Sequence, residues 1–262
     1  MRPQFDALLT DIEGTTTSID FVKNVLFPYA ANYALEFLQR IIDHSTSEKS
    51  DRFRQLIVDL INTSNESADP QIVKVSSGND LGSKLAANVQ QWIQQDKKVA
   101  PSHYVEFLVF QLIALKKLQG FIWEDGYRNG SLKAHVYSDV PGAFQKLSEL
   151  NVPIYIFSSG SVHAQQLLFS HTSYGDLTRF ISGYFDTTTG PKFEGASYLS
   201  IVEQIGLPAS KVMFLTDDEK EAMSADEAGL QVRVFMREGN APLSEKAKNK
   251  FKTVNSLAEI YE

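Results

Sequence analysis

Length, composition and charge describe an ordinary globular chain. Its 262 residues suffice for one large domain or for a core domain with an insertion, and a hydrophobic content of 43% can form a sizeable core. The net charge of −7 disfavours nucleic-acid and anionic-membrane partners, and the absence of cysteine excludes disulfides, thiolate zinc sites and a cysteine-nucleophile phosphatase.

The first predicted element is a short buried strand, ALLT, at residues 7–10. From about residue 20 to about residue 130, apolar side chains recur at helical spacing in three stripes. The stripes are Leu26, Tyr29, Tyr33, Phe37 and Ile41; then Phe53, Leu56, Ile57, Leu60 and Ile61; and then Val105, Leu108, Leu112, Leu115 and Leu118. Polar segments at 44–51 and 62–70 are predicted loops. We therefore expect a helical bundle here.

After residue 130 the pattern changes to alternating strands and helices. Strands are predicted at 152–157, 211–215 and 231–236, where short apolar runs are rich in β-branched and aromatic residues. Helices are predicted at 161–169, at 197–205 before Gly206 and at 219–228 before Gly229, and a further helix begins near Asp139. Alternating strands and helices imply a parallel sheet with helices on both faces.

The predicted fold class is therefore α/β, with a doubly wound, Rossmann-like parallel-sheet core and an inserted α-helical cap domain. The core comprises residues 1–19 and 130–262, because the strand at 7–10 completes the sheet from the far N-terminus. The cap comprises residues 20–129.

Polar residues cluster at the predicted strand ends. In an open α/β sheet, ligands bind beyond the carboxyl ends of the strands. The residues found there are Asp11 and Glu13 after the first strand, Ser158 to Ser161 after the strand at 152–157, and Asp217 and Asp218 after the strand at 211–215. Lys192 lies between the last two groups, in a loop before a helix. We expect these groups to meet in one crevice.

This combination suits phosphoryl transfer. A carboxylate can attack phosphorus to form an aspartyl-phosphate, which splits a difficult hydrolysis into two steps. Clustered acids repel one another unless a cation lies among them, and oxygen ligands favour Mg²⁺. Mg²⁺ and a lysine would neutralise the phosphoryl oxygens, while a serine turn at a helix start would donate hydrogen bonds to them.

Each of these residues also has a simpler explanation when taken alone. Asp11 could form a turn, the serines at 158–161 and the acids at 217–218 could cap the helices that follow, and Lys192 could be exposed to solvent. The joint order of acid pair, serine turn, lysine and acid pair favours a single site over these separate roles.

Six blocks of sequence carry a more specific pattern. They are DIEGTTTSIDFVKNVLFPYA (11–30), KLQGFIWEDGY (117–127), YIFSSGSVHAQQLLF (155–169), GYFDTTTGPKFEGASY (183–198), FLTDDEKEA (214–222) and REGNAPL (237–243). Together they resemble the haloacid-dehalogenase-like (HAD) superfamily, and within it the enolase-phosphatase, or acireductone synthase, family of methionine salvage. The blocks span most of the chain, and the likeness is weakest at about 43–103.

This resemblance implies a phosphoric monoester hydrolase with one Mg²⁺ per subunit. The family enolises 2,3-diketo-5-methylthiopentyl-1-phosphate and then removes phosphate, giving 1,2-dihydroxy-3-keto-5-methylthiopentene. The implied partner is this small phosphorylated diketone, with no nucleic acid and no membrane. We expect a monomer in the cytoplasm, with the nucleus as a second location.

The resemblance also implies roles for individual residues. Carried over by position, the metal ligands are Asp11, Glu13 and Asp217, with Glu13 acting at least partly through its backbone carbonyl. The implied substrate-binding residues are Ser158, Ser159 and Lys192, and the implied catalytic residues are Asp11, Glu13 and Lys192. Asp11 is the expected nucleophile. Glu221 would support the metal shell, and the choice between Asp217 and Asp218 as ligand stays open.

Glu13 departs from the usual superfamily pattern, which has aspartate two positions after the nucleophile. The enolase-phosphatase pattern shares this glutamate, whose extra methylene lets it serve as a general acid or base at a different atom. Three alternatives remain: a HAD phosphatase acting on another metabolite such as a sugar phosphate, a phospho-receiver module, and a catalytically silent binding protein. Receivers, however, are small and carry their acceptor after a later strand.

Overall fold

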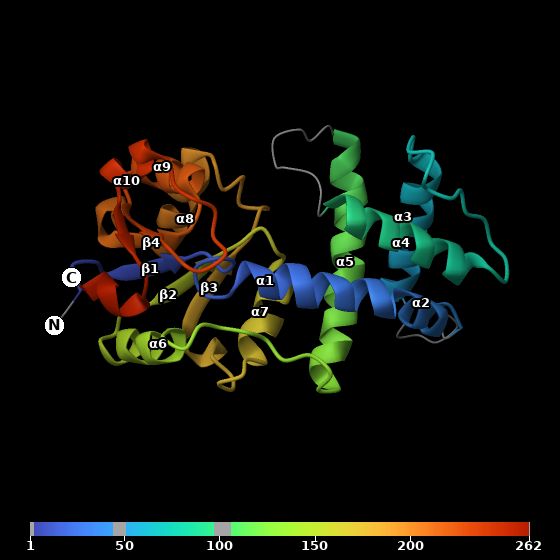
Figure 1. Cartoon of the computed structure of the whole chain (residues 1–262), viewed down its shortest axis with the longest axis horizontal. Coiled ribbons are helices and arrows are strands. Elements are labelled where there is room, and N and C mark those ends of the chain that lie inside the picture. The colour runs from blue at the N-terminus through green and yellow to red at the C-terminus, as the bar shows by residue number, and fades with distance from the viewer. Residues whose placement is uncertain (1–2, 44–50, 97–105, 262) are drawn as a thin grey trace. The chain divides into compact units, whose positions relative to one another are not determined.

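The computed structural model describes residues 3–43, 51–96 and 106–261 (Figure 1). The chain forms two compact units. One comprises Met1–Val22 together with Leu132–Glu262, and the other comprises Lys23–Ser131. Among the described residues, no helix has the length and apolar character needed to cross a membrane.

A six-stranded parallel sheet forms the centre of the first unit. Its strands are β1 (Ala7–Thr10), β2 (Ile154–Phe157), β3 (Ile181–Phe185), β4 (Val212–Thr216), β5 (Gln231–Phe235) and β6 (Lys252–Val254), in the spatial order β3-β2-β1-β4-β5-β6. Strand β1 pairs with two distant segments, since Leu8 lies opposite Ile154 on one side and Met213 on the other. The predicted α/β class with a parallel sheet is confirmed.

Helices cover both faces of this sheet (Figure 1). α6 (Val140–Glu149) and α7 (Val162–Ser170) lie on one face, where the rings of Phe144 and Phe169 are 6.1 Å apart. α8 (Gly195–Ile205), α9 (Glu219–Glu227) and α10 (Glu245–Lys250) lie on the other, around the fully buried Tyr198. Because both faces are covered, every residue of β1 and β4 is buried.

Two predicted helix ends are confirmed in the first unit. Gly206 ends α8 with a φ of +77°, and Gly229 follows α9 with a φ of +87°. A left-handed backbone at these positions favours glycine, which has no Cβ to clash with the following carbonyl. The remaining short elements are the 3₁₀ turns η3 (Thr178–Phe180), η4 (Ala209–Lys211) and η5 (Leu257–Tyr261).

The second unit is built from helices. The helical segment entering it comprises α1 (Ile19–Phe21), the π-helical turn η1 (Val22–Leu26) and α2 (Phe27–Asp43). The π-helical turn ends two residues before Pro28, which has no N–H for the regular helical hydrogen bond. The other helices are α3 (Asp51–Glu66), α4 (Leu81–Asp96) and α5 (Glu106–Arg128).

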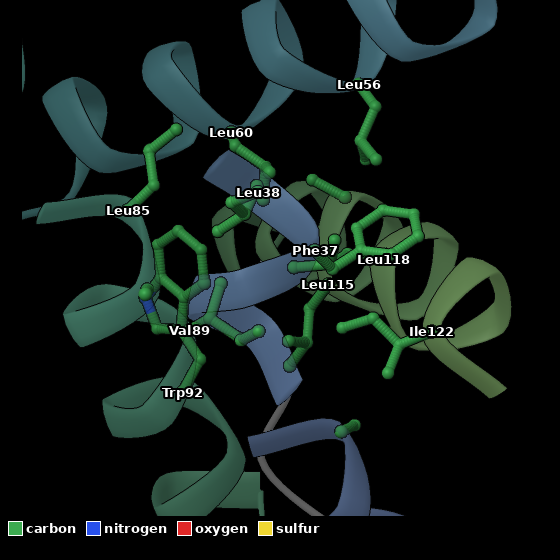
Figure 2. Close-up of a cluster of buried hydrophobic side chains, with 14 of the residues drawn as sticks. Phe37, Leu38, Leu56, Leu60, Leu85, Val89, Trp92, Leu115, Leu118 and Ile122 are labelled. Carbon is green, nitrogen blue, oxygen red and sulfur yellow. The ribbon is translucent and has the colours of Figure 1, made fainter. Parts of the chain in front are cut away.

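The core of the helical unit takes one face from each long helix (Figure 2). Leu38, Leu60, Leu85 and Leu118, from α2, α3, α4 and α5, are completely buried. The three predicted stripes contribute to this core, although Tyr33 is 41% exposed. Val105, Leu108 and Leu112 lie outside the residues whose side chains the structure describes.

The predicted loop at 62–70 is wrong in its first half, because α3 continues to Glu66. The hydroxyls of Thr63 and Ser64 donate to the carbonyls of Asp59 and Leu60 one turn earlier, at 2.7 and 2.8 Å. Polar side chains that bond back to their own helix remain compatible with it, although their composition is typical of loops. The other predicted loop, at 44–51, lies outside the described residues except for Asp51, which begins α3.

An extended segment between α3 and α4 is held by two asparagine side chains. Asn88, which is completely buried, accepts from the N–H of Val73 and donates to its carbonyl, both at 2.8 Å. Asn65 makes the same pair of bonds with Val75, again at 2.8 Å. The side-chain amides thereby replace the partner strand that an extended backbone normally needs.

Candidate active site

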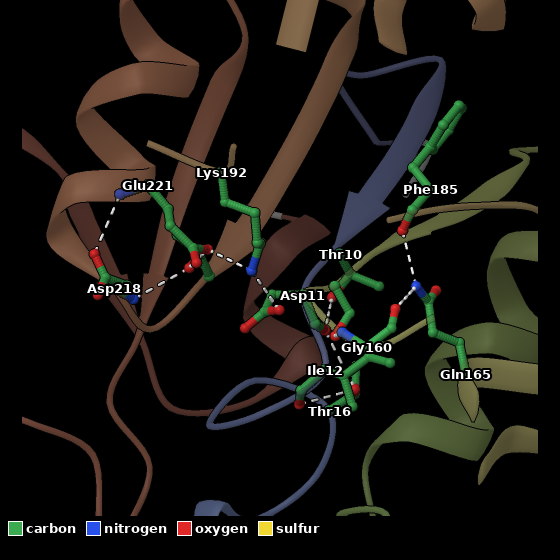
Figure 3. A network of polar contacts seen from close by, with 12 residues as sticks. Thr10, Asp11, Ile12, Thr16, Gly160, Gln165, Phe185, Lys192, Asp218 and Glu221 are labelled. Carbon is green, nitrogen blue, oxygen red and sulfur yellow. Dashed lines mark hydrogen bonds and ion pairs between the residues drawn. The ribbon is translucent and has the colours of Figure 1, made fainter. Parts of the chain in front are cut away.

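A buried ion cluster lies at the carboxyl end of β1 (Figure 3). The Nζ atom of Lys192 donates to Asp11 Oδ1 at 2.6 Å and to Glu221 Oε2 at 2.7 Å. Glu221 Oε2 also accepts from the hydroxyl of Thr216 at 2.8 Å. Only 6% of Asp11 and 7% of Lys192 are exposed, so these charges meet in a nearly dry environment. Such charges persist only when they are paired and hydrogen-bonded.

The motif DIEGTTT forms a tight turn that holds Asp11 at the end of β1. The N–H of Asp11 continues the sheet by donating to the carbonyl of Leu215 at 2.9 Å. The carbonyl of Ile12 then accepts from the N–H groups of Thr15, Thr16 and Thr17 at 3.3, 2.9 and 2.8 Å. All three threonines are completely buried, so they build the turn rather than face a ligand.

Glu13 lies in the same turn and is half-buried. Its backbone forms an isolated parallel bridge with that of Thr17, which closes the turn behind it. The turn continues into the returning chain, since the Thr17 hydroxyl donates to the carbonyl of His135 at 2.6 Å. The orientation of Glu13 therefore depends on a backbone that is held on both sides.

Lys192 comes from the loop before α8 and is oriented by that helix. The hydroxyl of the fully buried Tyr198 donates to the backbone carbonyl of Lys192 at 2.6 Å. The two residues are six positions apart, so this bond fixes the loop against the first turn of α8. Tyr198 was not identified from the sequence, where its only signal is an aromatic residue at the start of a predicted helix.

The two acids after β4 have different roles. Asp218 Oδ1 accepts from the N–H groups of Lys220 and Glu221 at 2.7 and 3.2 Å, so Asp218 is the N-cap of α9. Asp217 lies against Gly14, because a Cβ added to Gly14 would be only 2.3 Å from Asp217 Oδ2. The structure therefore separates a helix cap from an acid that faces the turn after β1.

The gathered acids have perturbed pKa values. Burial, followed by the charges of Asp11 and Glu221, raises the pKa of Asp217 to about 8. Burial likewise raises the pKa of Glu221 to about 7, even though Lys192 lowers it, and burial also raises the pKa of Asp11. For Lys192, burial opposes the charged form, but the charges of Asp11 and Glu221 prevail and raise its pKa. Perturbed acids in one cluster are typical of functional sites.

The serine turn lies after β2, next to β1 in the sheet. The buried Ser158 accepts from the N–H of Gly160 at 3.3 Å, which leaves its own hydroxyl proton available to a ligand. Ser159 is exposed, and Ser161 is the N-cap of α7. The buried Gln165, which the sequence analysis missed, donates to the carbonyls of Gly160 and Phe185 at 2.8 and 2.9 Å and anchors the turn (Figure 3).

The structure thus brings the predicted acids and lysine to one edge of the sheet. Asp11 and Lys192 are in direct contact, and Asp217 lies against the turn that contains Glu13. Glu221, which the sequence suggested as support for a metal, contacts the lysine. Among the described residues, no three His, Cys, Asp or Glu side chains form a metal-binding group. The predicted Mg²⁺ ligands differ from such a group, because Glu13 would contribute its backbone carbonyl rather than its side chain.

Comparisons with known proteins agree with this architecture. A family model described as haloacid dehalogenase-like hydrolase matches residues 5–229. The chain is 43% identical to enolase-phosphatase E1 of Caenorhabditis briggsae over 98% of this chain and 97% of the relative. It is 41% identical to enolase-phosphatase E1 of Persephonella marina over 90% of each chain.

A solved structure is also similar. The UTR4 protein of Saccharomyces cerevisiae matches with a TM-score of 0.69 and 30% identity, over 96% of this chain and 98% of that one. Both the sequence and the fold are therefore shared along nearly the whole length. From the family model and these relatives, the chain belongs to the haloacid dehalogenase-like hydrolases, and within them to the enolase-phosphatase E1 family.

Proposed function

We propose that this chain is an enolase-phosphatase of methionine salvage. It enolises 2,3-diketo-5-methylthiopentyl-1-phosphate and then hydrolyses the phosphate ester, giving 1,2-dihydroxy-3-keto-5-methylthiopentene and phosphate. The observation that carries the proposal is the buried Asp11 carboxylate held by Lys192 at the carboxyl end of β1, in a chain whose relatives bear the name enolase-phosphatase.

Asp11 is the nucleophile in this proposal. Its Oδ1 is bound to Lys192, which orients the carboxylate and favours its ionised form against the burial that raises its pKa. A carboxylate oxygen attacks phosphorus, the bond from phosphorus to the substrate oxygen breaks, and Glu13 protonates the leaving oxygen. Water then attacks the aspartyl-phosphate, releasing phosphate and restoring Asp11. Lys192 also offsets the negative charge of the phosphoryl oxygens during both steps.

Ser158 and Ser159 bind the phosphate group in this proposal. Both lie at the carboxyl end of β2, next to β1, and the hydroxyl of Ser158 keeps a proton to donate. Gln165 supports the geometry by fixing the carbonyl of Gly160 within the same turn. A turn at the start of a helix suits an anion, because the helix dipole places partial positive charge there.

The residues present also fit one Mg²⁺ per subunit. Asp11, Asp217 and the backbone carbonyl of Glu13 would hold it, an all-oxygen set of the kind that Mg²⁺ prefers. Burial and two neighbouring acids raise the pKa of Asp217 to about 8, an unfavourable clustering that a cation relieves. The missing side chain of Gly14 leaves room for the Asp217 carboxylate. When bound, the ion polarises substrate oxygens and neutralises phosphoryl charge.

The enolisation step requires a group that moves a proton on carbon. Glu13 is the candidate in the first unit, because it is half-buried, lies two positions after Asp11 and has a longer side chain than the aspartate usual at this position. A residue of the helical unit, acting as a cap, is the alternative. We assign residues 20–129 that cap role, which would exclude water from the reaction.

The proposal is tested by incubating the protein with the diketo phosphate and Mg²⁺ while enol absorbance and phosphate release are followed together. A sugar phosphate serves as the control substrate. Asp11→Asn should abolish phosphate release and leave enolisation measurable, whereas Glu13→Gln should slow at least one of the two steps. If Asp11→Asn released phosphate at the wild-type rate, Asp11 would not be the nucleophile.

Other outcomes identify the alternatives. Faster release from the sugar phosphate would indicate a HAD phosphatase with a different substrate. A stable phosphoaspartate with no continuing release would favour a receiver module. We also propose a cytoplasmic monomer, with the nucleus as a second location, that binds neither nucleic acid nor membrane; the net charge of −7 supports the last point. Size-exclusion chromatography at several concentrations tests the monomer.

A further inference from the structure

The loop after β5 reaches back to the turn that follows β1. The Nδ2 atom of Asn240 donates to the carbonyl of Gly14 at 2.9 Å and to the carbonyl of Phe235 at 3.1 Å. Because both partners are acceptors, the amide nitrogen must face them, and the opposite orientation of the side chain would set oxygen against oxygen. Asn240 therefore joins the end of β5 to the turn that contains Glu13.

Gly14 has the left-handed backbone conformation in that turn. Its φ is +70°, and a Cβ added there would lie 2.3 Å from Asp217 Oδ2 and 2.9 Å from Asn240 Oδ1. The turn needs glycine both for its backbone angle and for the close approach of these two side chains. Glycine restricts its own backbone angles less than any other residue. The hydrogen bond from Asn240 therefore restrains the orientation of the Gly14 carbonyl.

Arg237 supplies a second donor from the same loop. Its Nη2 atom donates to the carbonyl of Thr15 at 3.2 Å and to both carboxylate oxygens of Asp139 at 2.9 and 3.1 Å. Asp139 in turn accepts from the N–H of Leu257 at 2.7 Å, and the guanidinium lies 4.1 Å from the ring centre of Tyr137. Arg237 is thus held on several sides, and it does not move freely with the turn.

The two side chains therefore bind consecutive carbonyls, those of Gly14 and Thr15, immediately after Glu13. We propose that Asn240 and Arg237 are positioning residues, which fix the peptide groups after Glu13 and thereby aim this acid at the reacting atoms. Neither residue touches the substrate in this proposal. It rests on the proposed function only in that Glu13 takes part in the chemistry.

Asn240→Asp is the most informative variant. It keeps the size of the side chain but removes both N–H donors and sets an oxygen against two carbonyls. Asn240→Ala removes the contact without that repulsion, and Arg237→Lys keeps the charge but loses the planar fork. Glu238→Gln is the matched control, because Glu238 belongs to the same loop and is exposed.

The test measures phosphate release at saturating substrate and well below each variant's Tm, so that the folded fraction is equal. For Asn240→Asp we expect kcat to fall about ten- to hundredfold, as for a small misplacement of a catalytic group, with KM changed less than about threefold. Asn240→Ala and Arg237→Lys should lose less. A kcat for Asn240→Asp within about threefold of that of Glu238→Gln would overturn the proposal, even if Tm fell.

A second measurement keeps the result independent of substrate identity. Amide hydrogen exchange of residues 13–17 should speed up about tenfold or more in Asn240→Asp and not in Glu238→Gln, because a released turn opens more often. Unchanged exchange would refute the inference whatever the activity. Kinetics are also recorded with an aryl phosphate. Activity on the aryl phosphate alone would refute the proposed substrate, while the Asn240 comparison would still decide the positioning role.

Discussion

Replacing Lys192 by methionine removes the cation shared by Asp11 and Glu221. The lysine nitrogen lies 2.6 and 2.7 Å from their oxygens, and 8% of its side chain is exposed. Removing one partner of a buried ion pair costs about 3–5 kcal/mol, because the remaining charge is left without compensation. A typical domain has about 5–15 kcal/mol of stability in total, so the variant should fold but with a much smaller free energy of unfolding.

The loss should depend on pH in a defined direction. Burial already raises the pKa values of Glu221 and Asp11, and without Lys192 both rise further. The folded variant then keeps these acids neutral at pH values where the unfolded chain ionises them. Stability falls with rising pH between the unfolded pKa, near about 4, and the folded pKa of each acid, by at most about 1.4 kcal/mol per pH unit. The wild-type protein shares this slope for Glu221 up to its pKa of about 7, so the extra loss of the variant grows above that pH. The destabilisation should be small near pH 5 and large near pH 8.

Urea unfolding at about pH 5 and about pH 8 measures this difference. Circular dichroism is the suitable signal, because both tryptophans, Trp92 and Trp123, belong to the helical unit and not to the unit that contains Lys192. Lys211→Met is the control: Lys211 has a half-exposed side chain 3.8 Å from Asp6, and surface pairs contribute about 0–1 kcal/mol. Equal losses at both pH values, or a loss near pH 8 no larger than the control's, would refute the reasoning.

Gly14→Ala should reduce phosphate release more than about tenfold and lower Tm, because the methyl group meets Asp217 and the left-handed backbone costs about 1–2 kcal/mol; wild-type kinetics would contradict this. Tyr198→Phe should lose about 1–3 kcal/mol in urea unfolding, since it leaves the carbonyl of Lys192 buried without its donor. Asn88→Ala should lower the free energy of unfolding of the helical unit by a similar amount, which tryptophan fluorescence would measure. Mg²⁺ should raise Tm more at about pH 8.5 than at about pH 6.5, because it competes with the proton on Asp217, and the Asp217→Asn variant should lose that difference.

The central strands and the site acids were predictable because their signals are local. The runs of β1, β2, β4 and β5 are apolar and bounded by polar turns, and the polar residues that follow them are adjacent in sequence. Strand β3 was missed because only Phe185 of its five residues is buried, and Gly183 interrupts its pattern. Strand β6 has three residues and α10 six, too short for a periodic signal. Helix α4 was missed although Leu85, Val89 and Trp92 have helical spacing.

The contacts within the site depend on distant parts of the chain. Lys192 and Asp11 are 181 positions apart, and their order in the sequence did not indicate that the lysine would bind this acid directly. In the sequence, Glu221 is an acid after Asp217 and cannot be distinguished from a metal ligand. The structure shows instead that its carboxylate pairs with Lys192. Asn240 and Gly14 are 226 positions apart, and the sequence around either residue does not predict the hydrogen bond between them.

The central place of β1 in the sheet has a consequence for synthesis of the protein. This strand is synthesised before the other strands of the sheet, but Leu8 pairs with Ile154 and Met213, which are made much later. At about 5–20 residues per second, the wait for the first partner is roughly 7 to 30 s. The helical unit, a continuous segment, can fold during that time. In a chain that stops before β4, the edge of β1 that normally pairs with β4 would be unpaired. Unpaired strand edges promote aggregation.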